Sequence, residues 1–404
     1  MKRDMKASLF LLIICSIFIA CAVDNQHTNK EIPIELTDYE WRVPFKSTLD
    51  TSVEFTRLYE RDETLLLFFQ DSIGQFIKKY NKLGGSIIWE TAIPETFHVW
   101  TNKELRPSNR SFYLNGNFGL TGNVDLSDGS FNDNTFDGMI TDVISYEETD
   151  VISSDKAIYV LSREGTQNLA LVNPTSTNLK SSHQLIQNEL GDVFLLEYLG
   201  IIGPQIGKIY RNIYQVLSKG NINLKLLTQS EITKDVEYYD ASLFTDFTSD
   251  SIILLTKRDK IIGYHIYSGS QTESSPSVFS RYGNNEYRIH EDIIAVKHSP
   301  NDIMILDRKT LSVISQHEIG QLYSMNRQEV GFIKQNLLEI GNFLRLFNYE
   351  RGNWTNVFHT PTGSNEIGDF GGLHFQSHTM DQEYIYVSDE IYLYKIKKED
   401  LLKN

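Results

Sequence analysis

Leu65-Leu-Leu-Phe-Phe69 and Gln75-Phe-Ile-Lys-Lys-Tyr80 are two short segments separated by the turn residues Asp71-Ser-Ile-Gly74. The first segment is apolar throughout and the second mixes polar and apolar residues, so the pair predicts two β-strands joined by a turn. A polar turn with two glycines, Asn81-Lys-Leu-Gly-Gly85, then leads into a third apolar segment. This unit decides the fold because it recurs along the chain.

The unit recurs from residue 65 to residue 387, with eight first strands. Its mean spacing of about 46 residues lies within the roughly 40 to 50 residues of a four-stranded propeller blade. A β-sandwich seldom extends this far as one domain, and parallel β-helices repeat at much shorter periods. We therefore predict an all-β fold, a single β-propeller of seven or eight four-stranded blades. The first strands are Leu65–Phe69, Phe112–Leu114, Ala157–Leu161, Val193–Leu196, Ile252–Leu255, Ile293–Val296, Val330–Ile333 and Tyr384–Val387.

The composition agrees with a β fold in a cysteine-poor chain. The sequence has 21 Tyr and 22 Phe against 9 Pro, and aromatic side chains pack well on pleated strands. The two cysteines, Cys15 and Cys21, both lie near the N-terminus, so the rest of the chain has no disulfide, cysteine nucleophile or thiolate metal site. The formal charge of -15 without a basic block argues against nucleic-acid binding.

The N-terminus carries a basic start, an apolar run from Ala7 to Ala20, and then Cys21. The run is shorter than the roughly 20 residues needed to span a bilayer as a helix. The arrangement resembles a bacterial lipoprotein signal, which implies cleavage before Cys21 and lipidation of its thiol. The alternative is an ordinary secretory signal cut near Ala20 or Ala22. Ala22 follows the cysteine where an aspartate would favour the inner membrane, so the resemblance implies anchoring at the outer membrane.

Three regions follow from this reading: a signal peptide at residues 1–20, a lipidated cysteine with a polar tether at residues 21–30, and a propeller domain at residues 31–404. The last unit ends at the charged Lys397-Lys-Glu-Asp400 without room for an outer strand. We therefore predict that an N-terminal strand closes the ring. The alternating segment Glu31-Ile-Pro-Ile-Glu-Leu36 is the candidate, with Pro33 suited to an edge strand, and it would pair beside Ile391–Ile396.

The segment from Pro204 to Thr228 has two interpretations. Apolar residues from Ile206 to Leu217 fit helical spacing, with Gly220 at a plausible helix end. The competing interpretation is a hairpin of Asn212–Ser218 and Ile222–Thr228, turned by Lys219-Gly-Asn221. The hairpin restores the blade pattern, and we favour it.

Asn81-Lys-Leu-Gly84-Gly85-Ser-Ile-Ile-Trp89 resembles the docking motif of quinoprotein-alcohol-dehydrogenase-like propellers, in which Asp, Thr, Gly and a later Trp lock adjacent blades. Asn81 stands for the Asp and Gly84 for the Thr, whereas Gly85 and Trp89 match. The resemblance implies the architecture of eight-bladed bacterial outer-membrane lipoproteins. Degenerate copies are Asp125-Leu-Ser-Asp128-Gly129, Asn173-Pro-Thr-Ser176, Asp307-Arg-Lys-Thr310 and Asn348-Tyr-Glu-Arg-Gly352-Asn-Trp354.

Two clusters invite a metal-site hypothesis, and neither meets the requirements. Asp125, Asp128, Asp133, Asp137 and Asp142 are dense, but a calcium loop starting at Asp133 would place Ile144 where a bidentate Glu is needed. His374 and His378 lie four residues apart with Asp381 beyond, and zinc needs further ligands and a polar surround. Gly116, Gly119 and Gly122 lack a dinucleotide-binding context and are interpreted as turn glycines. We therefore predict no metal site and no cofactor.

The sequence thus predicts a lipid-anchored cell-envelope propeller that acts as a protein- or ligand-binding scaffold, with a protein or glycan partner and no assigned catalytic residue. The alternative is an envelope enzyme, either a quinoprotein-type dehydrogenase or a carbohydrate-active propeller. The quinoprotein enzymes need a calcium-bound cofactor and a catalytic Asp, and no residue here can be assigned to those roles. Three or more convergent carboxylates in the central funnel would favour catalysis.

Overall fold

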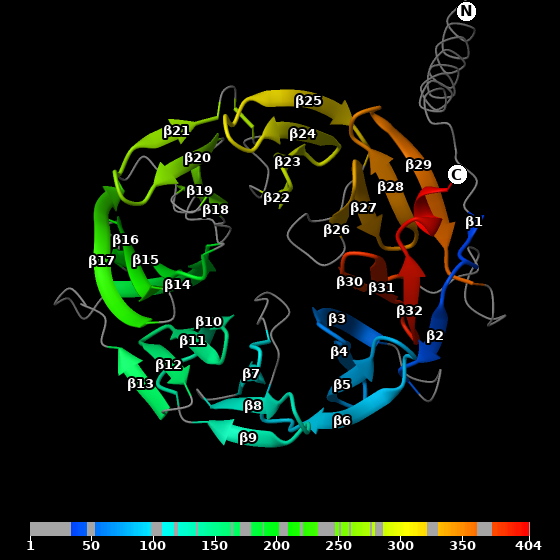
Figure 1. Ribbon diagram of the computed structural model, residues 1–404, viewed down its shortest axis with the longest axis horizontal. Coiled ribbons are helices and arrows are strands. Elements are labelled where there is room, and N and C mark those ends of the chain that lie inside the picture. Colours follow the sequence, from blue (N-terminus) through cyan, green and yellow to red (C-terminus); the bar gives the residue numbers. More distant parts are fainter. Residues whose placement is uncertain are drawn as a thin grey trace, which may run out of the picture.

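The chain forms a ring of eight β-sheets, numbered here as blades 1 to 8 in chain order (Figure 1). In six blades the strands follow one another from the centre of the ring outward, with antiparallel neighbours. The other two blades have the same arrangement with a strand from the N-terminal part of the chain added at the outer edge, and one of these added strands pairs parallel. This arrangement is a β-propeller, and it confirms the predicted fold with eight blades. The computed structural model describes residues 34–46, 53–97, 107–116, 120–134, 136–162, 165–169, 179–188, 190–201, 209–218, 221–232, 247–249, 252–257, 260–274, 277–278, 286–320, 330–361 and 374–403.

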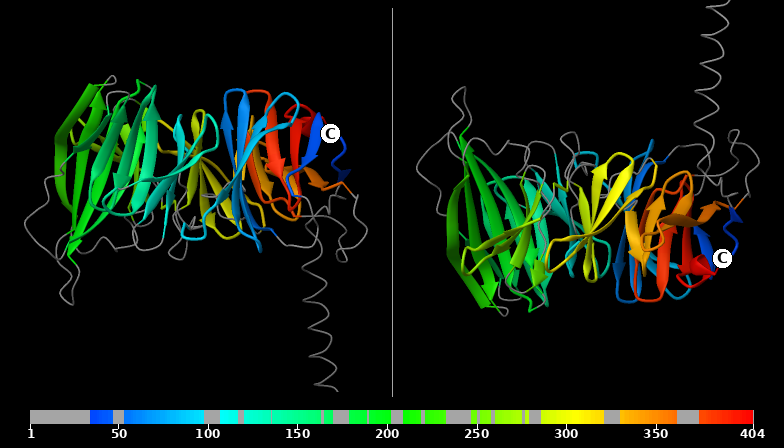
Figure 2. Two further views of the ribbon diagram at one scale, coloured as in Figure 1. Left: turned by 90° about the horizontal axis from the view of Figure 1, so that it is seen from below. Right: turned by 90° about the horizontal axis from the view of Figure 1, so that it is seen from above.

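Among blades 1 to 4, blade 4 has the longest strands and stands tallest (Figure 2). Their strands are β3 (Val53–Arg61), β4 (Thr64–Asp71), β5 (Gln75–Asn81) and β6 (Ile87–Ile93) in blade 1; β7 (Ser111–Asn115), β8 (Thr121–Asp125) and β9 (Phe131–Asn134) in blade 2; β10 (Ile140–Tyr146), β11 (Thr149–Ser154), β12 (Ile158–Ser162) and β13 (Gly165–Leu169) in blade 3; β14 (Leu179–Gln187), β15 (Val193–Ile201), β16 (Ile209–Ser218) and β17 (Asn221–Ile232) in blade 4.

Blades 7 and 8 each include a strand from the N-terminal part of the chain. The strands are β18 (Phe247–Ser249), β19 (Ile252–Lys257), β20 (Lys260–His265) and β21 (Gln271–Glu273) in blade 5; β22 (Tyr287–His290), β23 (Ile293–Ser299), β24 (Asp302–Asp307) and β25 (Val313–Glu318) in blade 6; β26 (Val330–Ile333), β27 (Asn336–Ile340), β28 (Leu344–Asn348) and β29 (Asn353–His359) with β1 (Ile34–Glu35) in blade 7; β30 (Ser377–Met380), β31 (Tyr384–Ser388) and β32 (Tyr392–Lys397) with β2 (Trp41–Pro44) in blade 8.

Among the described residues, the hydrophobic core is divided into eight clusters, and each cluster joins two consecutive blades. One cluster, for example, places Leu66 and Phe68 of blade 1 against Phe112 and Leu114 of blade 2. The last one places Tyr386 and Leu393 of blade 8 against blade 1, so the series of contacts runs completely around the ring. Because both faces of a middle strand are covered by neighbouring blades, residues Leu65–Phe69 of β4 form a continuous apolar run rather than an alternating one.

One turn conformation recurs between the third and outer strands of five blades. The N–H of its fifth residue donates to the carbonyl of its first residue over 2.8 to 2.9 Å, and the fifth residue has a positive φ. Glycine adopts that conformation without strain, and blade 6 has Leu311 in its place. The turns are Asn81–Gly85, Asp125–Gly129, His265–Gly269, Asp307–Leu311 and Asn348–Gly352.

The resemblance to a docking motif is supported at the seam between blades 1 and 2. Trp89 lies over Gly129, where an added Cβ would be 2.8 Å from the indole, and the Thr91 hydroxyl donates to the Gly129 carbonyl over 2.5 Å. Trp41 covers Gly85 in the same way and donates to the Lys82 carbonyl over 3.1 Å.

Other residues replace the tryptophan elsewhere. The His317 ring lies over Gly352, and the Asn356 amide donates over 2.7 Å to the carbonyl of Leu401, which lies in the 3-10 helix η3 (Asp400–Leu402). Trp354 instead contacts Phe347 of its own blade. The copy expected at residues 173–176 lies outside the described residues.

An N-terminal strand closes the ring, as predicted, but the assigned segment was wrong. β2 pairs antiparallel with β32 and supplies the outer strand of blade 8. β1 instead adds to β29 of blade 7 as a parallel fifth strand. The physical reason is burial: Leu36 packs in the cluster between blades 7 and 8, and Phe45 packs in the cluster between blades 8 and 1. Residues 31–33, which include Pro33, lie outside the described part.

A charged group reinforces the seam between blades 8 and 1. The Lys82 ammonium lies 3.0 Å from the Asp381 carboxylate and 2.5 Å from that of Glu60, and the Tyr386 hydroxyl donates to Asp381 over 2.9 Å. Burial opposes ionisation of Asp381, but the Tyr384 N–H, Lys82 and Tyr386 together lower its pKa to about 2. Asp381 is therefore ionised at neutral pH and anchors this seam.

The hairpin interpretation of the region after Pro204 is confirmed, because β16 and β17 form an antiparallel pair. Two of the eight predicted first strands occupy a position in their blade that is one strand away from the position of the other predicted first strands. Residues 157–161 belong mainly to the third strand of blade 3, and Val330–Ile333 is the innermost strand of blade 7. Among the described residues, no helix has the length and apolar character needed to cross a membrane.

The buried carboxylate of Asp389 in blade 8 gives a pH-dependent prediction. Its two oxygens accept the Tyr394 hydroxyl and the N–H groups of Ile391 and Tyr392. Burial nevertheless raises its pKa from 3.8 to about 6. Since the folded state binds this proton between pH 3.8 and about 6 while the unfolded state does not, this group adds stability as the pH falls through that window.

We expect Asp389→Asn to remove that component. The amide retains an acceptor for the two backbone N–H groups and carries no charge, so the variant should gain up to about 3 kcal/mol over the natural protein at pH 7. The gain should shrink toward pH 4, where the natural carboxyl is itself protonated. Urea unfolding at both pH values measures this difference, and a gain that is constant with pH would contradict the assignment.

Candidate binding surface

The propeller has two faces that differ in the connections they carry. The face with the connections between second and third strands, such as Asp71–Gln75 in blade 1 and Ser154–Ile158 in blade 3, is called the front face here. The back face carries the turns between third and outer strands, such as Asn81–Ile87. In blade 2 the turn Asp125–Gly129 identifies β8 and β9 as third and outer strands, so the β7–β8 connection lies on the front face.

Three apolar side chains project from the front face of blades 1, 2 and 3. Ile73 is 71% exposed, Leu120 is 49% exposed and Met139 is 41% exposed. They lie in the β4–β5 connection, the β7–β8 connection and the segment that enters β10. Single exposed apolar residues are normal, but three on consecutive blades of one face provide apolar area for a partner.

Local hydrogen bonds determine where these side chains point. The Asp71 carboxylate accepts the N–H of Ile73 over 2.8 Å and that of Gly74 over 3.1 Å, which closes a tight turn with Ile73 at its tip. The Met139 N–H donates to the Asp155 carboxylate over 2.8 Å, and the Met139 carbonyl accepts the Asp155 N–H over 3.0 Å. Both apolar side chains are thereby held outward by a rigid backbone.

Leu120 and Met139 share the seam between blades 2 and 3. The Gly116 N–H donates to the Leu120 carbonyl over 2.7 Å. The neighbouring Asn115 side chain exchanges two hydrogen bonds with the backbone of Ile140, of 2.9 and 2.8 Å. A Cβ at Gly116 would lie 2.9 Å from both the Leu120 Cβ and the Thr96 carbonyl, so this position requires glycine.

Acidic side chains surround this apolar seam. Glu95, Asp133, Asp137 and Asp155 are all exposed on or beside the front face of blades 1 to 3. The Lys156 ammonium lies 2.9 Å from the Asp137 carboxylate, and this hydrogen bond raises the pKa of Lys156. Among the described residues of this surface, four carboxylates against one ammonium give a negative charge. We call Ile73, Leu120 and Met139 with these five charged residues the front surface.

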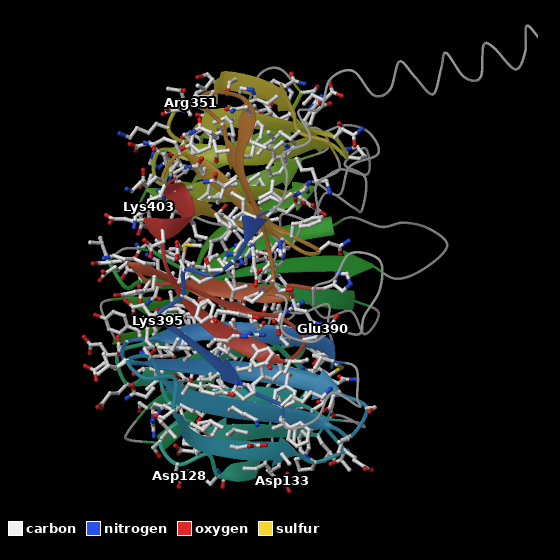
Figure 3. All side chains as sticks on the ribbon, turned by 90° about the vertical axis from the view of Figure 1, so that its right-hand side faces the viewer. Asp128, Asp133, Arg351, Glu390, Lys395 and Lys403 are labelled. Atoms are coloured by element: carbon white, nitrogen blue, oxygen red, sulfur yellow. The ribbon has the colours of Figure 1, made fainter. Side chains whose placement is uncertain are left out.

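The structure does not bring together the two clusters that were considered as metal sites. Asp125 and Asp128 form hydrogen bonds within the back-face turn of blade 2, whereas Asp142 accepts the N–H of Leu185 from blade 4. In Figure 3, Asp128 and Asp133 lie toward opposite sides of the ring. In the described ranges, no three His, Cys, Asp or Glu side chains are placed to hold one metal ion.

The histidine cluster is also dispersed. His378 packs against Gly331 of blade 7, where a Cβ would lie 2.4 Å from the imidazole, and Asp381 belongs to the seam with Lys82. His374 is exposed. Gly122 lies inside β8, so its interpretation as a turn glycine was wrong; it leaves room for Phe131 and Phe97. Gly119 and Cys21 lie outside the described residues.

A buried polar network in blade 4 was not predicted. His183, Glu197 and Asn212 are cross-strand partners in β14, β15 and β16. The Glu197 carboxylate lies 3.3 Å from the imidazole of His183 and accepts the Asn212 amide over 2.9 Å and the Tyr214 hydroxyl over 3.2 Å. The His183 ring also contacts the Ser154 carbonyl of blade 3. The group is enclosed in the core, and it links two blades rather than facing a ligand.

The available sequence signals for these residues were weak. Glu197 interrupts the apolar run Val193–Leu199, which marks a buried polar position but gives no partner. Ile73, Leu120 and Met139 are apolar residues in connections, and a connection is normally polar. Their common face becomes apparent only once the strand order is known.

The comparisons with known proteins support the fold alone. No protein-family model matches the chain, and no curated protein matches its sequence. The crystal structure of BamB from Moraxella catarrhalis is similar with a TM-score of 0.51 and 10% identity, covering 88% of this chain and 100% of that chain. The computationally designed Ika8 protein is similar with a TM-score of 0.50 and 12% identity, covering 90% of this chain and 100% of that one.

Proposed function

We propose that this protein is a lipid-anchored scaffold of the cell envelope that binds a partner protein through the front surface. The observation that carries the proposal is the set of apolar side chains, Ile73, Leu120 and Met139, exposed on the same face of three consecutive blades. Aliphatic side chains held by a rigid backbone gain free energy when a second protein removes them from water.

The fold supports a scaffold role in a second way. Hydrophobic clusters at each of the eight interblade seams, with the charged seam at Lys82, join consecutive blades all the way around the ring. A rigid scaffold of this kind presents binding residues without an ordering cost. The fold likeness to BamB agrees with this architecture. A protein partner is favoured over a glycan because the exposed apolar side chains of the front surface, Ile73, Leu120 and Met139, include no aromatic ring on which a sugar could stack.

Photo-crosslinking in intact cells tests the binding proposal. A photo-reactive residue at position 73 should give a discrete protein adduct. The same residue at position 83 provides the control, because Leu83 is 84% exposed on the back face of the same blade. An adduct at position 73 that weakens when Leu120→Ser removes apolar area from the next blade of the same face would support the proposal. Equal adducts at both positions, or none at position 73, would reject it.

The anchor proposal rests on Cys21 after its short apolar run. We expect Cys21→Ser to move the protein from the membrane fraction to the soluble periplasmic fraction, or to stall its processing, because serine offers no thiol for the lipid. Cell fractionation with immunoblotting measures this change. Cys15→Ser is the matched control and should leave membrane association unchanged. Normal processing and membrane association of the Cys21 variant would contradict the anchor.

A further inference from the structure

We propose that the partner presents a cationic amphipathic segment to the front surface, with apolar side chains over Leu120 and Met139 and lysine or arginine side chains toward Glu95, Asp133 and Asp155. This inference rests on the proposed function and specifies the chemistry of the partner. Apolar area alone does not select an occupant, whereas the sign of the surrounding charge does.

The carboxylates of the front surface differ in their local partners. Asp137 is held by Lys156, and Asp155 accepts the Met139 N–H. Glu95 and Asp133 are exposed, and within the described ranges neither forms an ion pair. Their negative charge therefore faces solvent beside the apolar seam. A cation that approaches Glu95 and Asp133 gains attraction from both carboxylates without having to displace an ion pair between described residues.

The overall charge of the chain also favours a cationic partner. Both faces carry acidic side chains, with Asp133 and Glu390 toward one side of the ring and Asp128 toward the other, where Arg351 and Lys403 also lie (Figure 3). With a formal charge of -15 over the whole chain, a cationic segment is attracted from a distance, and the apolar side chains of the front surface provide the place where it docks.

The same charges disfavour the other occupants. In a symmetric dimer through this face, the same patch of both copies would meet, which would bring Glu95 and Asp133 of each copy close to those of the other. Anionic lipid headgroups and nucleic-acid phosphates are repelled by the same carboxylates. An acidic protein segment would place its own carboxylates against those of the front surface, and removing like charges from water beside each other is unfavourable. A cationic amphipathic segment satisfies both the apolar and the charged parts of the surface.

Peptide binding to the full chain in neutral phosphatidylcholine nanodiscs tests the inference. The probes are a Leu/Lys amphipathic peptide, a Leu/Glu peptide of identical pattern and a Ser/Lys peptide of identical charge, each measured against empty nanodiscs. We expect the Leu/Lys peptide to bind most tightly. Its affinity should fall about tenfold in the double variant Glu95→Lys/Asp133→Lys at about 50 mM salt, and less at about 300 mM salt.

Glu63→Lys/Glu350→Lys is the matched control, since both residues are exposed on back-face turns and the charge change is equal. It should leave the affinity unchanged. Equal binding of the Leu/Glu or Ser/Lys peptide, or an equal loss in both double variants, would overturn the inference. If the position-73 adduct forms while charge reversal has no effect, the binding surface stands and the cationic partner is rejected. If the adduct is also absent, the proposed function itself fails.

Discussion

Deletion of residues 34–46 is expected to abolish cooperative folding of the propeller. These residues contribute β1 on blade 7, β2 in blade 8, and the buried side chains of Leu36 and Phe45. Truncating a buried Leu costs about 2–5 kcal/mol and a buried Phe about 3–5 kcal/mol. Together these losses approach the roughly 5–15 kcal/mol of a whole domain. Thermal melts followed by circular dichroism, with size-exclusion chromatography, measure the outcome.

Deletion of residues 22–30 is the matched control for this experiment. It shortens the proposed tether and removes none of the described contacts, so the melting temperature should stay within a degree or two. A protein lacking residues 34–46 that melts at the natural temperature as a monomer would contradict the closure mechanism. Leu36→Ala and Phe45→Ala, made singly, should each lower the melting temperature by a part of the full effect.

Gly191→Ala is expected to be the most damaging conservative substitution among the described glycines. A Cβ at Gly191 would lie 1.9 Å from the ring of Tyr146, which belongs to the preceding blade, and the backbone has a φ of +82°. The left-handed conformation costs an alanine about 1–2 kcal/mol. The overlap adds about 1–3 kcal/mol. We expect a loss of about 2–5 kcal/mol in urea unfolding.

Two variants separate these contributions. Gly320 has a φ of +74° and no atom within 4 Å of an added Cβ, so Gly320→Ala should show only the backbone cost. In a Tyr146→Ala background, Gly191→Ala should also cost only that amount, because the opposing ring is gone. A Gly191→Ala variant no less stable than Gly320→Ala would show that the blade 3–blade 4 contact adjusts without strain.

The strand pattern was predictable because most second strands are buried on both faces and read as continuous apolar runs. Leu65–Phe69 and Val193–Leu196 are of this kind. The position of the strand within the blade was wrongly predicted in blades 3 and 7 for the same reason. Ile158–Ser162 and Val330–Ile333 are also mainly apolar, but they are strands at other positions in their blades. An apolar run reports burial and does not report distance from the ring axis.

The docking turns were found where an Asp or Asn side chain bonds to the backbone of the turn. Asn81 and Asp307 accept N–H groups two and three residues ahead, which is the usual reason for these residue types in turns. The turn at His265–Gly269 adopts the same conformation without such a side chain, so the sequence gives no marker for it. His317 and Asn356 replace tryptophan because the contact between blades requires a flat side chain over the turn glycine and a hydrogen bond to the next blade. Residue types other than tryptophan can provide each of these.

The candidate binding surface could not be predicted from sequence position. Glu95, Leu120 and Asp155 come from connections and Asp133 from strand β9, in three blades altogether, and only the closed ring places them on one face. The expectation of no metal site is not decided by the geometry, which shows only that the described Asp and His clusters are dispersed. The hypothesis of a binding scaffold therefore came from the predicted fold, whereas the location of the candidate binding surface came from the structure.

The pairing of β2 with β32 has a consequence for the order of folding. The Tyr384 hydroxyl donates to the Glu40 carboxylate over 2.7 Å, although the two residues are 344 positions apart in the chain. Residues 34–46 leave the ribosome early and obtain their partners only after nearly the whole domain has been synthesised. Closing so long a loop in an unstructured chain is entropically unfavourable and slow, whereas blades formed from local hairpins bring the two ends together first. We therefore expect blades to form before the ring closes, with β1 and the open edge of β32 exposed to chaperones or to other chains until the final step.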